Sequence, residues 1–161
     1  MVSTGSTSGN GSTSGNGSTS GNGSTSGNGA TEGPQVGTRV VHRRYVPYSH
    51  AHYAGNLVDG AYSLGLFGDV ATEMCIVTDG DEGLFASYAD VQFRAPVRAG
   101  DVLEITCELV KAGTRSRVLD FTVTVVARGA ATEERPGAAE LLDPPVVATT
   151  ATGTVVVPPR A

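Results

Sequence analysis

The sequence has no tryptophan and only two cysteines, and these shortages exclude several classes of protein. Cys75 and Cys107 stand far apart and form no C-x-x-C pair, which excludes a disulfide-dense secreted scaffold and a zinc ribbon. Two isolated thiols are typical of small buried side chains in a reducing compartment. We therefore expect a cytoplasmic protein.

Long apolar runs and basic clusters are also missing. No apolar run approaches the roughly 20 residues that span a bilayer, and the N-terminus lacks the basic and apolar regions of a signal peptide. The chain carries 11 Lys and Arg against 16 Asp and Glu, and no basic stretch exceeds Arg43-Arg44. Nucleic-acid-binding surfaces depend on clustered basic residues. We expect neither a membrane nor a nucleic-acid partner.

The first 30 residues contain little that could form a core. Residues 5–28 are four copies of Gly-Ser-Thr-Ser-Gly-Asn, without charged or aromatic side chains. Such a tract cannot bury enough apolar surface to offset the entropy of ordering it. We predict a disordered tail or linker over residues 1–30 and one domain over residues 31–161, since the remaining length suffices for one core.

The period of the apolar residues changes along this domain. Residues 38–46 are β-branched and aromatic and predict a strand, whereas residues 57–78 have helical period with Asn56 as a plausible N-cap. Further strands are predicted in residues 84–97, with an interruption near Ala89-Asp90, in the alternating segments 103–109 and 119–125, and in residues 146–157. Residues 128–145 are interpreted as a long polar connection. One long helix with several antiparallel strands predicts an α+β architecture.

The predicted helix has an apolar face and three internal glycines. The apolar face is predicted to comprise Leu57, Ala61, Leu64, Phe67, Ala71, Met74 and Cys75. Gly60, Gly65 and Gly68 each cost about 1 kcal/mol relative to alanine within a helix. We therefore expect something to pack very closely against this helix.

Several motifs resemble those of a known family. Residues 93–101, FRAPVRAGD, are similar to the F-x-x-P-V-x-x-G-D turn of hotdog-fold acyl-CoA enzymes. Residues 113–116, GTRS, are similar to the hairpin motif of the same enzymes. Residues 52–61, 66–73 and 80–85 resemble the β-aminoacyl-CoA ammonia lyases, although Ala54 stands where glycine is expected. The resemblance covers about residues 38–158. It implies a hotdog fold, with one long central helix wrapped by a curved antiparallel sheet of about five strands.

The resemblance also implies a reaction, the removal of ammonia from 3-aminobutyryl-CoA or β-alanyl-CoA. This chemistry needs a base for the α-proton, donors for an enolate oxygen and an anion beside the departing ammonium. Backbone N–H groups at the helix start, from Asn56 to Gly60, are expected to bind the thioester oxygen. We favour Asp69 or His52 as the base and Asp59 beside the ammonium, with Glu73 as a further candidate. Each carboxylate has the alternative interpretation of a solvated helix residue, and Asp59 that of a residue favouring the helix dipole.

Coenzyme A enters only as part of the substrate, and no separate cofactor is expected. Arg94, Arg98, Arg115 and Ser116 lie in predicted turns, where they could meet the phosphates of coenzyme A or remain solvated. The acidic loop after the helix lacks the ligand spacing of an EF-hand, so no metal site is expected.

Three other functions share this fold and remain open: an acyl-CoA thioesterase, an enoyl-CoA hydratase and a non-catalytic acyl-CoA sensor. A thioesterase must activate water, whereas a lyase must exclude it from the thioester. A single unit of this fold leaves a sheet edge exposed, so we expect a homodimer or larger homo-oligomer whose site is shared between subunits.

Overall fold

The computed structural model describes residues 33–159, so the tail predicted for residues 1–30 lies outside the described residues. The elements in chain order are β1 (Arg39–Tyr45), the short 3-10 helices η1 (Tyr48–His50) and η2 (Ala54–Asn56), α1 (Gly60–Asp79), β2 (Leu84–Phe93), β3 (Val102–Ala112), β4 (Ser116–Gly129) and β5 (Ala139–Val156).

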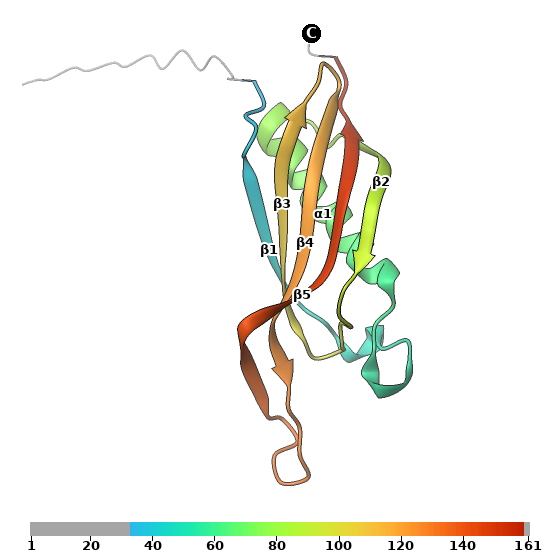
Figure 1. The fold of residues 1–161 in the computed structure, drawn as a ribbon, viewed down its shortest axis with the longest axis vertical. Helices are drawn as coiled ribbons and strands as arrows, with labels where there is room; N and C mark the ends of the chain where they lie inside the picture. Colours follow the sequence, from blue (N-terminus) through green and yellow to red (C-terminus); the bar gives the residue numbers. More distant parts are fainter. Residues whose placement is uncertain (1–32, 160–161) are drawn as a thin grey trace, which may run out of the picture. The chain divides into compact units, whose positions relative to one another are not determined.

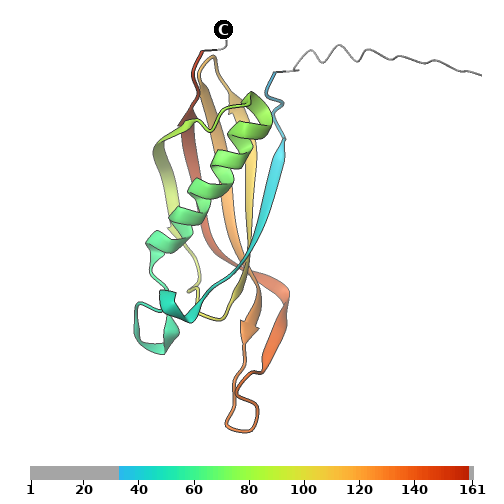
Figure 2. The same ribbon diagram turned by 180° about the vertical axis from the view of Figure 1, so that it is seen from behind.

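The five strands form one antiparallel sheet in the order β1-β3-β4-β5-β2. The sheet is open, with β1 and β2 at its edges. Figures 1 and 2 show α1 lying along one face of this sheet, which curves around the helix. The predicted α+β hotdog architecture is confirmed.

The core lies between α1 and the concave face of the sheet. The helix buries Ser63, Leu66, Phe67, Val70, Ala71, Met74 and Cys75. Phe67 stacks on Phe121 of β4, with ring centroids 4.9 Å apart. The predicted apolar face was therefore wrong at Ala61, which is exposed, and it omitted Leu66 and Val70. The predicted face was counted from Leu57, which lies before the first helical residue, so the helical spacing was applied from a residue outside the helix.

The helix begins later than its period indicates. Its N-cap is Asp59, whose carboxylate accepts a hydrogen bond of 2.9 Å from the Tyr62 N–H, and the predicted N-cap Asn56 has a left-handed φ of 60°. Contacts with a distant segment of the chain explain this late start. Leu57 pairs with Arg98, and the Val58 N–H donates to the Val97 carbonyl oxygen at 3.0 Å, so this segment is extended.

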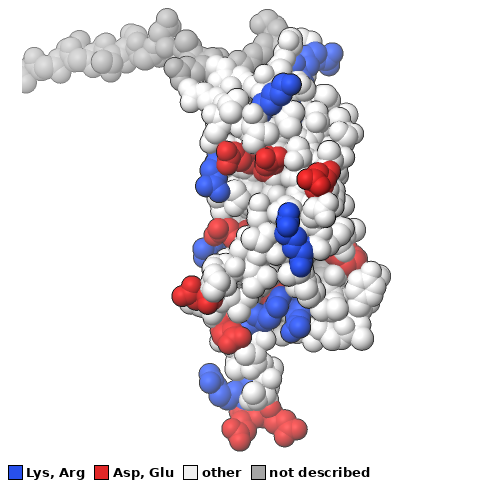
Figure 3. All heavy atoms as spheres, viewed as in Figure 1, with Lys and Arg blue, Asp and Glu red and all other residues white. Residues whose placement is uncertain are grey.

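The predicted long connection was also wrong at both ends, because residues 128–129 belong to β4 and residues 139–145 to β5. β4 continues to Gly129 and pairs with the first residues of β5, as in Ala127 with Leu141 and Gly129 with Ala139. These paired ends form an arm, residues 127–141, which extends beyond the helix-covered part of the sheet (Figure 1). Acidic side chains gather at the end of the arm in Figure 3.

The interruption predicted in β2 is confirmed. The register of β2 against β5 shifts between Ala89 and Gln92, and Asp90 within this shift has a φ of 51°. The β2 strand then ends at Phe93, where the chain turns toward the start of α1.

Candidate functional site

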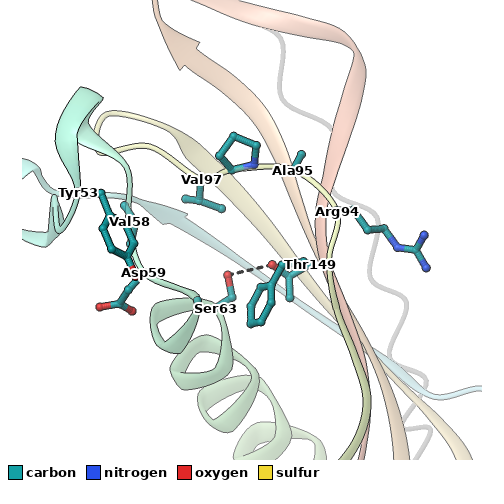
Figure 4. A pocket seen from close by; sticks show the side chains of 11 residues that line it. Tyr53, Val58, Asp59, Ser63, Arg94, Ala95, Val97 and Thr149 are labelled. Carbon is teal, nitrogen blue, oxygen red and sulfur yellow. Dashed lines mark hydrogen bonds between the residues drawn. The ribbon is translucent and has the colours of Figure 1, made fainter.

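A pocket of about 440 Å³ lies at the N-terminal end of α1 (Figure 4). It is bounded by the helix start, the segment before it, the turn after β2 and one residue of β5. The lining residues are Tyr53, Val58, Asp59, Gly60, Ser63, Phe93, Arg94, Ala95, Pro96, Val97 and Thr149.

The F-x-x-P-V-x-x-G-D turn builds one wall of this pocket, and its last residue is structural. Asp101 is fully buried and accepts hydrogen bonds from the Arg98 N–H at 2.9 Å and from the Arg128 guanidinium at 2.9 and 2.8 Å. Gly100 has a φ of 91°, and a Cβ there would come within 2.9 Å of the Tyr48 hydroxyl oxygen. Glycine and aspartate therefore hold the turn against the loop before α1.

Gly60 is the first residue of α1 and lines the pocket. First-turn N–H groups have no partner within the helix, and no hydrogen bond among residues 33–159 uses the Gly60 N–H. A Cβ at Gly60 would lie 2.6 Å from the Phe93 ring, whereas one at Gly65 or Gly68 would meet none of the described residues within 4 Å. The expected close packing is therefore present at Gly60, where Phe93 provides it.

The structure brings His52 and Asp59 together beside this helix start. The His52 Nδ1 atom lies 3.9 Å from one carboxylate oxygen of Asp59, and both side chains are partly exposed. The other carboxylate oxygen of Asp59 accepts the capping hydrogen bond. Asn56 is exposed, and its carbonyl oxygen accepts a hydrogen bond from the Ala99 N–H at 2.8 Å. Asn56 thus joins the loop to the pocket wall through its backbone.

Asp69 does not line this pocket. It lies ten residues beyond Asp59, which corresponds to about 15 Å along a helix, and forms an ion pair of 3.6 Å with Arg44. Asp69 and Arg44 line a second pocket of about 430 Å³ together with Tyr62. Burial raises the pKa of the Tyr62 hydroxyl, an effect that Arg44 opposes and Asp69 reinforces. Glu73, the further candidate for the base, pairs with His42.

The predicted coenzyme A contacts fall at two ends of the molecule. Arg94 lines the pocket, but its side chain points away from it in Figure 4, and its Nε donates to the Thr150 hydroxyl at 3.2 Å. Arg115 directly precedes β4 and Ser116 is its first residue, and the Arg117–Asp79 ion pair joins this end of β4 to the C-terminal end of α1. A 20-residue helix is about 30 Å long, so within one chain these two residues are remote from Gly60.

Sequence reasoning missed three residues that shape the pocket: Ser63, Phe93 as its aromatic wall, and Thr149. The hydroxyl oxygens of Ser63 and Thr149 lie 3.2 Å apart, and the two residues are only 2% and 1% exposed. A serine one turn after Gly60 was an available signal. The sequence contained no signal for Thr149, because its proximity to Ser63 depends on packing between the sheet and the helix.

Neither a metal cluster nor a membrane span is present in the described part of the chain. No group of three His, Cys, Asp or Glu side chains in residues 33–159 is arranged to hold a metal ion. No helix in the same residues is long and apolar enough to cross a bilayer.

The fold is that of a hotdog protein, and the family model of the thioesterase superfamily matches residues 55–130. The chain is 48% identical over 110 residues to a 3-aminobutyryl-CoA ammonia lyase of Acetoanaerobium sticklandii, covering 67% of this chain and 85% of the relative. The chain belongs to the β-aminoacyl-CoA ammonia lyase family.

Solved structures agree with this assignment. The β-alanyl-CoA:ammonia lyase from Clostridium propionicum is 36% identical, with a TM-score of 0.72, covering 79% of this chain and 94% of that one. An acyl-CoA hydrolase from Staphylococcus aureus has a TM-score of 0.58 at 18% identity, covering 74% of this chain and 62% of that one, a likeness that shows the fold alone.

Proposed function

We propose that the protein is a carbon–nitrogen lyase that removes ammonia from a short β-aminoacyl-CoA, 3-aminobutyryl-CoA or β-alanyl-CoA. The observation that carries this proposal is the 48% identity to a 3-aminobutyryl-CoA ammonia lyase. The likeness to a β-alanyl-CoA:ammonia lyase supports the same reaction class. The product is the α,β-unsaturated thioester.

The helix start suits the enolate that this reaction develops. A base takes the α-proton, the C–H electron pair becomes the new double bond, and the C–N pair leaves with the nitrogen. Charge accumulates on the thioester oxygen meanwhile. The available N–H of Gly60, at the positive end of α1, is placed to stabilise that charge in the pocket.

The carboxylate of Asp59 suits a position beside the ammonium, because it lines the same pocket. His52 is the base that one chain can supply, since its ring, which does not itself line the pocket, lies 3.9 Å from the Asp59 carboxylate, which does. Asp69 is the base that a second copy would have to supply, because it lies outside the pocket of its own chain. We retain both as alternatives.

We also propose a homodimer or larger homo-oligomer with a shared site, which the same geometry supports. Asp69, Arg115 and Ser116 lie away from the pocket of their own chain, and the open sheet leaves β1 and β2 as edges that another chain could cover. A hotdog-fold thioesterase of Campylobacter jejuni, described as hexameric, is 21% identical with a TM-score of 0.58, which shows the fold alone. We also retain our proposals that the protein is cytoplasmic and needs no cofactor besides the coenzyme A of its substrate.

The discriminating experiment offers the protein two thioesters. With crotonyl-CoA and ammonia, a lyase forms 3-aminobutyryl-CoA and releases no free coenzyme A, which mass spectrometry and a thiol reagent measure together. With saturated butyryl-CoA, a lyase releases no thiol. Thiol release from butyryl-CoA would instead identify a thioesterase, the function that the superfamily assignment keeps as second candidate. Binding without turnover of either thioester would indicate a sensor.

A further inference from the structure

Two buried hydroxyl groups line the pocket, opposite each other. Ser63 projects from α1 and Thr149 from β5, and Figure 4 shows their hydroxyl oxygens pointing toward one another. Both residues are almost completely buried, at 2% and 1% exposure. Buried hydroxyls are costly unless they are hydrogen-bonded, and the bond between these two satisfies that requirement.

The pair retains unused hydrogen-bonding capacity. Each hydroxyl offers one O–H donor and two acceptor lone pairs. The 3.2 Å bond that joins them is the one hydrogen bond found for either side chain within residues 33–159. One O–H proton and lone pairs on both oxygens therefore remain available at the pocket wall.

The surrounding wall offers few competing polar groups. Val58, Phe93, Ala95 and Val97 contribute apolar surface, and the side chain of Arg94 points outward. Besides the exposed Tyr53 and the charged Asp59, a polar atom at the end of a short acyl group would therefore find its hydrogen-bonding partners at Ser63 and Thr149.

We propose that the Ser63–Thr149 hydroxyl pair binds the β-nitrogen of the substrate and selects β-amino thioesters over plain acyl thioesters; this inference rests on the proposed lyase function. Hydroxyls can accept hydrogen bonds from an ammonium and donate one to free ammonia, so the pair can hold the nitrogen on both sides of C–N cleavage. Ser63 lies three residues after Gly60, about 4.5 Å further along the same face of the helix. A thioester oxygen at Gly60 thus places the β-substituent near the pair, with the charge of Asp59 close by.

The test uses ligands that cannot react. In two coenzyme A analogues, an amide NH replaces the thioester sulfur, which makes the α-proton too weakly acidic to eliminate; one carries a 3-aminobutyryl group and the other a butyryl group. Calorimetry measures the affinity of each analogue for the full-length protein and for two variants. Thr149→Val removes the hydroxyl while keeping the side-chain volume, and Thr149→Ser keeps the hydroxyl.

We expect the wild type and Thr149→Ser to bind the amino analogue about tenfold or more tightly than the butyryl analogue. Thr149→Val should lose that preference while binding the butyryl analogue with unchanged affinity. A preference that survives in Thr149→Val, an equal loss of affinity for both analogues, or no preference in the wild type would each overturn the inference. The crotonyl-CoA assay is separate: a selective protein without lyase activity would refute the reaction and retain the nitrogen subsite.

Discussion

The carboxylate of Asp101 is completely buried and receives two hydrogen bonds from the guanidinium of Arg128, at 2.9 and 2.8 Å. Asp101 ends the turn that walls the pocket, and Arg128 lies in the β4–β5 arm, so this pair joins the site to the arm. The hydrogen bond to Asp101 raises the pKa of Arg128, which keeps the guanidinium charged.

Arg128→Met should destabilise the protein by about 3–5 kcal/mol, because it leaves a buried carboxylate without its partner. Urea unfolding of both proteins measures this change. The matched control is Arg43→Met, whose ion pair with Glu104 lies at the surface and should contribute less than about 1 kcal/mol. Equal losses in the two variants would show that the Asp101–Arg128 pair contributes no more than a surface pair.

Replacing Asp59 separates its capping role from its chemical role. Asp59→Asn keeps a side-chain oxygen for the Tyr62 N–H, so unfolding free energy should remain nearly unchanged. The loss of charge beside the departing ammonium should nevertheless reduce kcat/KM by about 100-fold. Asp59→Ala should lose both the charge and the capping hydrogen bond, which lowers the unfolding free energy by about 1 kcal/mol as well as the activity. Full activity in Asp59→Asn would restrict this residue to capping.

Gly60→Ala should impair catalysis without weakening the helix. The new Cβ would stand 2.6 Å from the Phe93 ring and force that ring to move within the pocket wall. We expect at least a tenfold loss of kcat/KM, on the order of 1.4 kcal/mol, in a steady-state assay. Gly68→Ala is the control, because its Cβ would meet none of the described residues within 4 Å and should add up to about 1 kcal/mol of stability at unchanged activity. Unchanged activity in Gly60→Ala would contradict the role of this contact.

The two buried thiols make stability depend on alkaline pH. Burial, the first of several causes, raises the pKa of Cys75 to about 11 and that of Cys107 to about 12. In the unfolded chain both thiols ionise near their ordinary pKa of about 8.5. The native state therefore holds more protons above that pH, and the free energy of unfolding should fall as pH rises from about 9 toward 11.

Urea titrations at pH 8 and pH 10 measure this fall. Burial also raises the pKa of Tyr62 and Tyr88, so some slope should remain in a Cys75→Ala, Cys107→Ala double variant. The double variant should nevertheless show a shallower dependence than the wild type. An identical slope would mean that the thiols are not the groups responsible.

Mixing inactive variants tests whether the site is shared. Asp69 lies outside the pocket of its own chain, so a site that uses both Asp59 and Asp69 must take them from two different chains. In a mixed oligomer of Asp69→Asn and Asp59→Asn chains, some sites would then contain both native residues. If Asp69 acts from a second copy, refolding the two variants together should restore activity above the sum of the separate proteins. Activity that remains additive would favour His52, whose ring already approaches Asp59, as the base.

The sequence placed three candidate site residues near each other but missed two residues that line the same pocket. His52, Asp59 and Gly60 were identified from their order along the chain, and the structure brings them to one end of α1. The pairing of Ser63 with Thr149 was missed because the two residues are 86 positions apart and become neighbours through packing. The helix start was placed too early because the pairing of Leu57 with Arg98, which keeps the segment extended, is a tertiary contact.

Local information determined the α+β architecture, since alternating and helical periods reflect which side of each element faces the core. Family membership was likewise recognisable from short motifs. The tertiary structure decided which helix residues are buried, that the polar segment after Arg128 forms an arm, and that Asp69 is remote from the pocket of its own chain. These features depend on contacts between distant segments, and the energy of such contacts exceeds the local preferences that a single sequence displays.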